Sequence, residues 1–542
     1  MKIEELEAIV ARAEKALNSE DHRRLKAAIE TLAWLTGEIE NKSVSIARLQ
    51  KLLFGAKTEK TSQVLKNDGT ESEASQAKSK AGAEEKEKPK GHGRNGAAAY
   101  SGAERIRVPH ESLKAGCLCP GCKKGKVYVL AEPQLIVRVT GQAPLRARVW
   151  EKETFRCNLC GELFPAKSPE GIGEKKYDES AAAIIGLLKY GTGFPFNRLE
   201  GLQGSFGIPL PAATQWEIVE EAAEVIAPAH GELTRQAAQG ELIHNDDTPM
   251  RILALGSGMS LKESESEEEE GVGKANKKER TGVFTTGILS THEGHQIGLF
   301  FTGSKHAGEN LTEVLKKRAS DLPPPIQMCD GLSRNNPSDE FETLLSNCIT
   351  HGRRNFVELV ENFPEECRHV IESLRVVYKT DAIARKQQLN PEARLELHQK
   401  ESGPVMAKLE KWMKEKLERK EVEPNSPLGK AINYMLKRWD KLTLFLCVPG
   451  APLDNNVCER ALKKAILHRK NALFYQTENG ARVGDIFMSL IHTAELAKAN
   501  PFDYLTELLK HGEDIKRDPA SWMPWNYRTT LAGLPHAPPV TP

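Results

Sequence analysis

The chain has no marked excess of charge of either sign and no long hydrophobic run. Its 542 residues include 76 Lys and Arg against 75 Asp and Glu, which gives a net charge of +1. Overall charge therefore does not favour a nucleic-acid partner, and any such attraction must come from local basic clusters. No run of about 18 apolar residues could span a bilayer, and no apolar signal opens the chain. These absences predict a cytoplasmic protein without a membrane partner, and the length predicts more than one domain.

A secretion signal is absent, so a reducing compartment is expected and the ten cysteines should be thiols or metal ligands. Four of them form two CxxC pairs separated by β-rich sequence: Cys119, Cys122, Cys157 and Cys160. Four thiolates so arranged are typical of a closed structural Zn²⁺ site. We therefore predict a zinc-binding, β-rich domain over residues 105–175, with unligated or redox thiols as the alternative. Cys117 is left out because a CxC spacing suits a zinc knuckle poorly.

Large apolar residues recur every seven positions near the N-terminus, at Leu25, Leu32, Ile39, Ile46 and Leu53. This spacing predicts an N-terminal coiled-coil helix within residues 1–55 and hence self-association, unless the stripe packs on the chain's own core. Residues 56–104 then contain almost no large apolar side chains and many charged ones. Such a composition cannot bury enough surface to offset the entropy of ordering, so it predicts a flexible charged linker.

Residues 176–240 have the pattern of helices separated by Gly and Pro. We expect them to form a DNA-binding or packing region. A helix, a Gly-containing turn and a second helix could be a helix-turn-helix motif. The helix after Pro211 is acidic, however, with glutamates at 217, 220, 221 and 224. Because that charge suits a DNA groove poorly, we favour a packing role.

Three acidic residues far apart in the chain suggest one metal-dependent nuclease site: Asp246 in ELIHNDDT, Asp330 in PIQMCDG and Glu459 in DNNVCERALKK. The first two end short apolar runs, where a strand places a carboxylate at the rim of a sheet, and the third opens a helix. Between the first two lie β-like runs at 250–255, 281–289 and 295–301, a helical stretch at 306–319 and a strand at 326–330. This order predicts a mixed α/β sheet. A charged insertion at about 259–280 interrupts it and is expected to be a solvated excursion.

The local sequence limits or offers a simpler interpretation for each of these acids. Asp246 and Asp247 point to opposite faces of a strand, so only one of them can face a metal. Asp330 before Gly331 could be an ordinary turn residue. Asn456 as N-cap with Glu459 three residues later resembles a capping box.

Further segments carry a closer resemblance. They are LLFGAKTEK, the paired CxxC motifs, HNDDTP, CDG, HGRRNF, DNNVCERALKKAILHRKNALF, SLIHTAEL and MPWNY. In this order, the chain resembles the bacterial insertion-sequence transposases of the sixty-six family, which are DDE transposases with a ribonuclease-H-like core. It departs from the family pattern at Leu332, Ala472 and Asp247, none of which is one of the three acids.

The resemblance implies a ribonuclease-H-like mixed-sheet catalytic core over residues 241–500, with a helical insertion at about 350–450. It selects Asp246 over Asp247 and makes Asp246, Asp330 and Glu459 the catalytic ligands of Mg²⁺ or Mn²⁺. The implied activity is DNA cleavage at insertion-sequence ends and strand transfer into target DNA. Two metal ions can support such displacements without a covalent protein intermediate, so the lack of a catalytic Tyr or Ser motif is expected. The implied partners are the element's terminal repeats, target DNA, a second copy of the chain and possible accessory proteins.

Basic residues near the acids are candidate phosphate contacts: Arg353, Arg354, Arg460, Lys463, Lys464, Arg469 and Lys470. For Arg353 and Arg354, surface salt bridges are an equally simple interpretation. The stripe Leu409, Trp412, Met413 and Leu417 in the helical insertion is expected to be core.

Two other functions stay open from the sequence. A nuclease without strand transfer could use the same acids, and a catalytically silent or accessory DNA-binding protein could derive from a transposase. Residues 501–542 are expected to form a C-terminal helix and a docked aromatic tail.

Overall fold

The structure is a computed structural model, and it describes residues 114–117, 124, 126–127, 143–156, 163–167, 175–255 and 282–534. The predicted coiled coil, the charged linker, the four CxxC cysteines and the charged insertion lie outside these residues. The chain divides into two compact units, residues 70–148 and the remainder. In the first, backbone hydrogen bonds join Gly116 and Cys117 to Val127. The second holds a short antiparallel pair, β1 (Thr154–Arg156) and β2 (Leu163–Pro165), and everything described below.

A five-stranded mixed sheet forms the centre of the larger unit, which confirms the predicted α/β class. Its strands are β3 (Leu242–Met250), β4 (Val283–His292), β5 (His295–Gly303), β6 (Ile326–Cys329) and β7 (Leu344–Asn347), in the spatial order β5-β4-β3-β6-β7. Strands β3, β4 and β5 pair antiparallel, whereas β6 and β7 run parallel to β3. The β-like run 250–255 is not a separate strand. Ile252 makes only an isolated bridge to Tyr475, and Leu253–Leu255 is a 3₁₀ turn.

Helices cover both faces of the sheet. On one face, a Cβ at Gly287 of β4 would meet Leu462 of α14 (Asn456–Ala472), and one at Gly298 of β5 would meet His492 of α15 (Glu478–Leu496). On the other face lie α6 (Ala212–Ala238) and α7 (Ala307–Leu315), and Asn310 of α7 donates to Thr286 of β4 at 2.8 Å. The acidic helix α6 therefore packs on the sheet, as its charge suggested.

The edge strand β5 has its outward N–H groups bonded by one helix. Asp485, Ser489 and Thr493 stand four residues apart on α15, and they accept from the backbone N–H groups of Thr302, Phe300 and Gly298 at 2.7, 3.0 and 3.1 Å. One polar stripe of a helix thus replaces the missing neighbouring strand, which closes this edge to further pairing.

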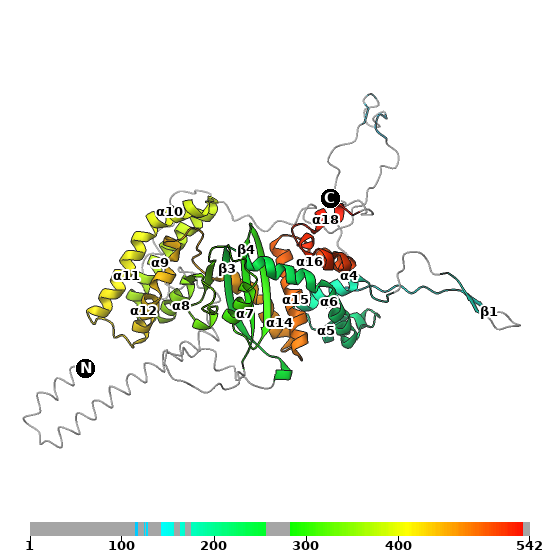
Figure 1. Cartoon of the computed structure of the whole chain (residues 1–542), viewed down its shortest axis with the longest axis horizontal. Helices are drawn as coiled ribbons and strands as arrows, with labels where there is room; N and C mark the ends of the chain where they lie inside the picture. The colour runs from blue at the N-terminus through cyan, green and yellow to red at the C-terminus, as the bar shows by residue number, and fades with distance from the viewer. Residues whose placement is uncertain are drawn as a thin grey trace, which may run out of the picture. The chain divides into compact units, whose positions relative to one another are not determined.

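The other edge, at β7, leads into the helical insertion, whose helices Figure 1 shows on the side of β3 away from β4. It comprises α8 (Ile349–Leu359), α9 (Pro364–Lys386), α10 (Pro391–Glu401), α11 (Gly403–Glu418), α12 (Pro427–Lys437) and α13 (Trp439–Leu442). Helices α8, α9, α11, α12 and α13 share a hydrophobic core in which Leu409 and Met413 are fully buried, with Trp412 and Leu417 packed against it. The predicted core stripe is confirmed.

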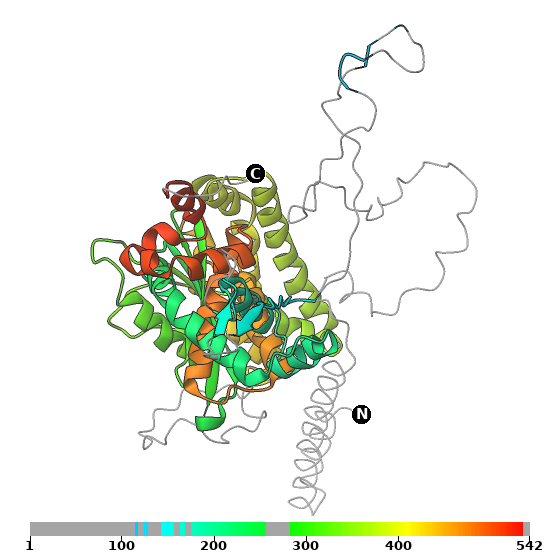
Figure 2. The same ribbon diagram turned by 90° about the vertical axis from the view of Figure 1, so that its right-hand side faces the viewer.

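The remaining helices lie beyond the β5 edge: α4 (Glu179–Gly186), a π-helical turn (Leu187–Gly191), α5 (Phe196–Ser205), α16 (Pro501–Lys510), α17 (Gly512–Arg517) and α18 (Tyr527–Ala532). Helix α16 packs on α4 and α17 on α6, and Figure 2 shows the C-terminal helices in red beside them. The aromatic tail is docked, because Trp525 stacks on His295 with ring centroids 4.4 Å apart and Tyr527 is buried. Among the described helices, none is long and apolar enough to cross a membrane.

Candidate metal and catalytic site

The sheet brings the first two acids to the same level. Strands β3 and β6 pair in parallel with His244 opposite Met328. Asp246 lies two residues after His244, and Asp330 lies two residues after Met328. Continuing the same register places the two acids at neighbouring positions. The pairing of β6 with β7, a strand that the sequence did not predict, sets Cys329 opposite Asn347. Cys348 and His351 then follow directly, at the start of α8.

Strand geometry separates the two adjacent acids. Asp246 is paired with Gly287, whose missing side chain leaves room for Cys458 and Leu462 of α14, so Asp246 lies on the face that α14 covers. Asp247 lies on the opposite face, where its buried carboxylate contacts His306 Nδ1 at 3.0 Å and Arg334 at 3.6 Å. Asp247 thus has its own partners, His306 and Arg334, and Asp246 is the acid directed toward α14.

Asp330 sits in a tightly held turn. Its Oδ1 accepts from the backbone N–H of Leu332 at 3.2 Å and from the side chain of Asn335. Arg438 of the helical insertion donates to the carbonyl oxygen of Gly331 at 3.0 and 3.2 Å. A Cβ at Gly331 would come within 2.2 Å of the Arg438 side chain, so any larger residue would displace this arginine. The turn interpretation of Asp330 therefore holds alongside its place in the site.

A buried asparagine fixes the start of α14 on the sheet. Asn455 contacts His244 Nδ1 at 3.0 Å through Oδ1 and donates to the Asn245 carbonyl oxygen at 3.1 Å through Nδ2. Burial lowers the pKa of His244 to about 4, so this imidazole is neutral near pH 7. The N-cap of α14 is Asn455, and its side chain makes no capping bond. The capping-box interpretation of Asn456 and Glu459 is therefore wrong, because Asn456 is already the first helical residue.

The three acids share one electrostatic environment. Burial raises the pKa of Asp246 well above its usual value, and the negative charges of Asp330, Asp247 and Glu459 raise it further. Burial also raises the pKa of Asp330, while the neighbouring His351 lowers it. Carboxylates crowded in this way repel one another unless a cation or protons neutralise them. The charges of Asp330 and Glu459 thus both act on Asp246.

The donor set around Glu459 suits a bound cation. Its Oε1 is buried without a hydrogen-bond partner in the described part of the chain, and His351 Nε2 lies 3.8 Å from it. Nδ1 of His351 is likewise buried and without a partner among those residues. Cys348, His351 and Glu459 each offer a ligand atom, and these atoms lie within 4.8 Å of one another. The CxxH spacing of Cys348 and His351 was the sequence signal for this group, and the sequence interpretation missed it.

The candidate phosphate contacts divide into two groups. Arg460, Lys463 and Lys470 on α14 are exposed. By contrast, Lys464 pairs with Glu495 of α15 at 2.8 Å, and Arg469 donates to the Pro249 carbonyl oxygen. In α8, Arg353 is buried and Arg354 partly buried. The exposed group alone lies open to a ligand without rearrangement.

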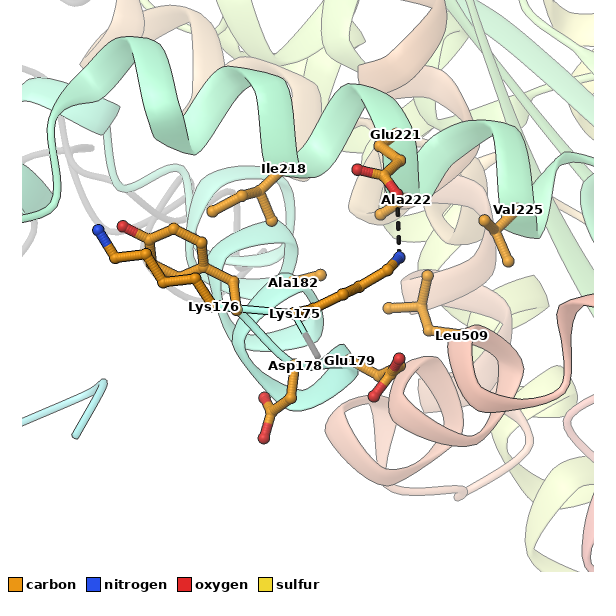
Figure 3. A pocket seen from close by; sticks show the side chains of 11 residues that line it. Lys175, Lys176, Asp178, Glu179, Ala182, Ile218, Glu221, Ala222, Val225 and Leu509 are labelled. Carbon is orange, nitrogen blue, oxygen red and sulfur yellow. Dashed lines mark hydrogen bonds and ion pairs between the residues drawn. The ribbon is translucent and has the colours of Figure 1, made fainter. Parts of the chain in front are cut away.

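A separate cavity of about 280 Å³ lies between α4, α6 and α16. Figure 3 shows Lys175 reaching across it to Glu221, an ion pair of 3.0 Å in which both side chains are largely exposed. None of the three acids lines this cavity. Its walls lack the converging buried polar groups of a binding site, so it gives no functional assignment.

The fold and the acids define a class: a mixed α/β protein in which a sheet and one helix hold a carboxylate-rich candidate metal site. Comparison with known families narrows this class. The family model described as "Transposase IS66 family" matches residues 175–483, which is more than half of the chain. The chain therefore belongs to this family. The resemblance read from the sequence is confirmed.

Three proteins of Sinorhizobium fredii (strain NBRC 101917 / NGR234) are similar to the chain. "Uncharacterized protein y4jD" is 30% identical over 193 residues, 35% of this chain and 37% of that protein. "Uncharacterized protein y4hP" is 23% identical over 462 residues, 79% and 76% of the two chains. "Uncharacterized protein y4qI" is 24% identical over 369 residues, 66% and 64%. The chain thus spans little more than a third of the first relative, and none of the three names states an activity.

Proposed function

We propose that the protein is a DDE transposase that cleaves DNA at the ends of its element and joins those ends to target DNA. The observation that supports this proposal is that the charges of Asp330 and Glu459 both act on the buried Asp246, in a chain of the IS66 family. The acids come from three segments separated by more than eighty residues each, and Asp246 and Asp330 each follow the parallel pair His244–Met328 by two residues.

The sheet supports a ribonuclease-H-like assignment for this core. Three antiparallel strands are followed by a helix and two strands parallel to the first, and the first acid lies on the central strand. The second acid follows the adjacent parallel strand, and the third lies on a helix packed over the same face. This is the order that the sequence resemblance implied.

In the proposed chemistry, Asp246, Asp330 and Glu459 would hold Mg²⁺ or Mn²⁺, since hard carboxylate oxygens suit these ions. Bound divalent cations would supply the charge that polarises a phosphodiester and activates an oxygen nucleophile. The chain's own contribution is to position the ligands. Asn335 and the backbone of Leu332 fix the Asp330 carboxylate, and Asn455 fixes the helix that carries Glu459.

Exposed cations on α14 suit a DNA backbone beside this site. Lys463 and Lys470 follow Glu459 by four and eleven residues, so they share its helical face, and Arg460 is adjacent. We assign phosphate contacts to these three first. Lys464, Arg469, Arg353 and Arg354 contribute only if DNA binding releases them from their present surroundings.

The proposal also includes partners and a structural metal, some of which would bind residues outside the described ranges. DNA is the substrate, a dimer formed through the N-terminal heptads is the working unit, and Zn²⁺ on Cys119, Cys122, Cys157 and Cys160 has a structural role. Accessory proteins of the same element are further candidate partners.

The test uses a labelled DNA carrying the element's ends, incubated with the full chain and Mg²⁺. Asp246→Asn, Asp330→Asn and Glu459→Gln should each abolish cleavage and joining while DNA binding persists. Glu478→Gln is the matched control, because Glu478 is also a first-turn glutamate but is exposed at the start of α15. It should react like the wild type.

Other outcomes would select the alternatives. Cleavage without joined product indicates a nuclease that lacks strand transfer. DNA binding without metal-dependent chemistry in the wild type refutes the transposase activity and indicates a silent or accessory DNA-binding protein.

A further inference from the structure

One group of side chains beside the proposed catalytic acids has a different chemical character. Cys348 is the N-cap of α8 and His351 lies in the first turn of that helix, so a single turn presents a thiol and an imidazole together. Glu459 reaches them from α14, and the three ligand atoms lie within 4.8 Å of one another. A site of sulfur, nitrogen and oxygen donors favours Zn²⁺ and its neighbours over Mg²⁺.

The surroundings favour the metal-binding form of the cysteine. The Cys348 sulfur accepts from the backbone N–H of Asn455 at 3.2 Å. An amide donor stabilises a thiolate. Burial opposes this and raises the pKa of Cys348 to about 11. A cation at the site would offset that burial cost, and the thiol proton would pass to solvent on binding.

Two atoms of the group also lack their own partners. Oε1 of Glu459 and Nδ1 of His351 are buried without hydrogen bonds in the described ranges. Metal–donor distances at zinc sites are about 2.0–2.3 Å, so a small side-chain rotation would bring all three donors into range of one ion.

We propose that Cys348, His351 and Glu459 form a binding site for a late first-row divalent cation such as Zn²⁺. This ion takes Glu459 as a ligand and thereby competes with Mg²⁺ at the catalytic site. The protein would then be inhibited by free Zn²⁺ while Mg²⁺ supports its reaction. The inhibition rests on the proposed function, whereas the binding of the ion does not.

Cobalt(II) is the probe for binding, because a thiolate ligand gives it a near-ultraviolet charge-transfer band. The full-length wild type is titrated with Co²⁺ beside Cys348→Ser, which retains a hydrogen-bond acceptor for Asn455 but removes the sulfur. Both proteins keep the same CxxC cysteines, so their difference reports Cys348 alone. Cys447→Ser is the matched control, since Cys447 is an exposed free thiol outside the group.

The wild type and Cys447→Ser should bind one more Co²⁺ per chain, with thiolate absorption, than Cys348→Ser. Glu459→Gln should weaken this binding at least about tenfold, and excess Mg²⁺ should raise the apparent Kd. Equal cobalt binding and equal spectra in the wild type and Cys348→Ser would overturn the site. If circular dichroism shows that Cys348→Ser does not fold, His351→Gln gives the same comparison.

The competition is tested separately with Zn²⁺ in the Mg²⁺-dependent DNA cleavage assay. Zn²⁺ should inhibit the wild type at concentrations that leave Cys348→Ser active, and equal inhibition of both proteins would overturn the competition. A wild type that binds Co²⁺ through Cys348 but never cleaves DNA would contradict the proposed function and leave the metal site established.

Discussion

Replacing Asn455 by Ala should destabilise the protein strongly, because this side chain joins two distant segments at the candidate site. It is fully buried, and it bonds both His244 Nδ1 and the Asn245 carbonyl oxygen on the central strand β3. Its backbone N–H reaches the Cys348 sulfur as well. The start of α14, four residues before Glu459, is thus held on the sheet by one amide group.

The expected loss of unfolding free energy follows from the two buried groups that would lose their hydrogen-bond partner. An alanine leaves a buried imidazole nitrogen and a buried carbonyl oxygen without this amide, and each such loss costs about 1–3 kcal/mol. We therefore expect the free energy of unfolding to fall by about 2–6 kcal/mol. Mg²⁺-dependent DNA cleavage should fall too, because Glu459 loses its fixed position.

The assay is chemical unfolding followed by circular dichroism, with Asn456→Ala as the control. Asn456 is the adjacent residue of the same type, and its side chain makes no hydrogen bond within the described residues. Its loss should change stability by no more than about 0.5 kcal/mol. A larger effect at Asn456 than at Asn455 would refute this reasoning and restore the capping-box interpretation.

Two further predictions concern the contact between α15 and the edge strand. Ser489→Ala leaves the buried N–H of Phe300 without its acceptor and should cost about 1–3 kcal/mol in unfolding free energy, whereas the exposed Ser205→Ala should change little. Asp485 is buried and accepts from Thr302, and burial raises its pKa to about 7. As the pH rises, the Asp485 carboxyl of the unfolded chain loses its proton at about 3.8, well before the folded carboxyl does. The folded state is therefore most stable below pH 3.8, and it loses stability as the pH rises to 7. Between pH 4 and pH 8 this loss in the free energy of unfolding amounts to up to about 4 kcal/mol, and Asp485→Asn should remove it. If the variant shows the same dependence of unfolding free energy on pH as the wild type, the prediction is wrong.

Local patterns in the sequence anticipated most of the regular structure. The apolar runs became β3, β4, β5 and β6, and helices formed where the residues had helical spacing. The exceptions are informative. The run 250–255 has the composition of a strand, but beyond Met250 it makes a single bridge, to Tyr475, within the part of the chain that the structure describes. The short strand β7 (Leu344–Asn347) has no distinctive pattern and is a strand because β6 pairs with it.

The candidate site shows the same division. Sequence alone selected Asp246, Asp330 and Glu459, because each lies within a family motif. The expectation that Asp246 ends its strand was wrong, because β3 continues to Met250 in its pairing with β4. It could not show that Lys464 and Arg469 are tied to Glu495 and to a backbone carbonyl, since those partners lie on other elements. It also could not reveal that Arg438, 107 residues away in sequence, holds the turn after Asp330.

By itself, the sequence predicted most of the elements, the candidate acids and the family, because hydrophobic periodicity, turn residues and the order of motifs are properties of residues close together in the chain. Only the tertiary structure decided which adjacent carboxylate faces α14, which asparagine fixes that helix, and that a thiol and an imidazole stand beside Glu459. Those outcomes depend on strand register and on which face of a helix is buried. Both are set by contacts between segments that are distant in the chain.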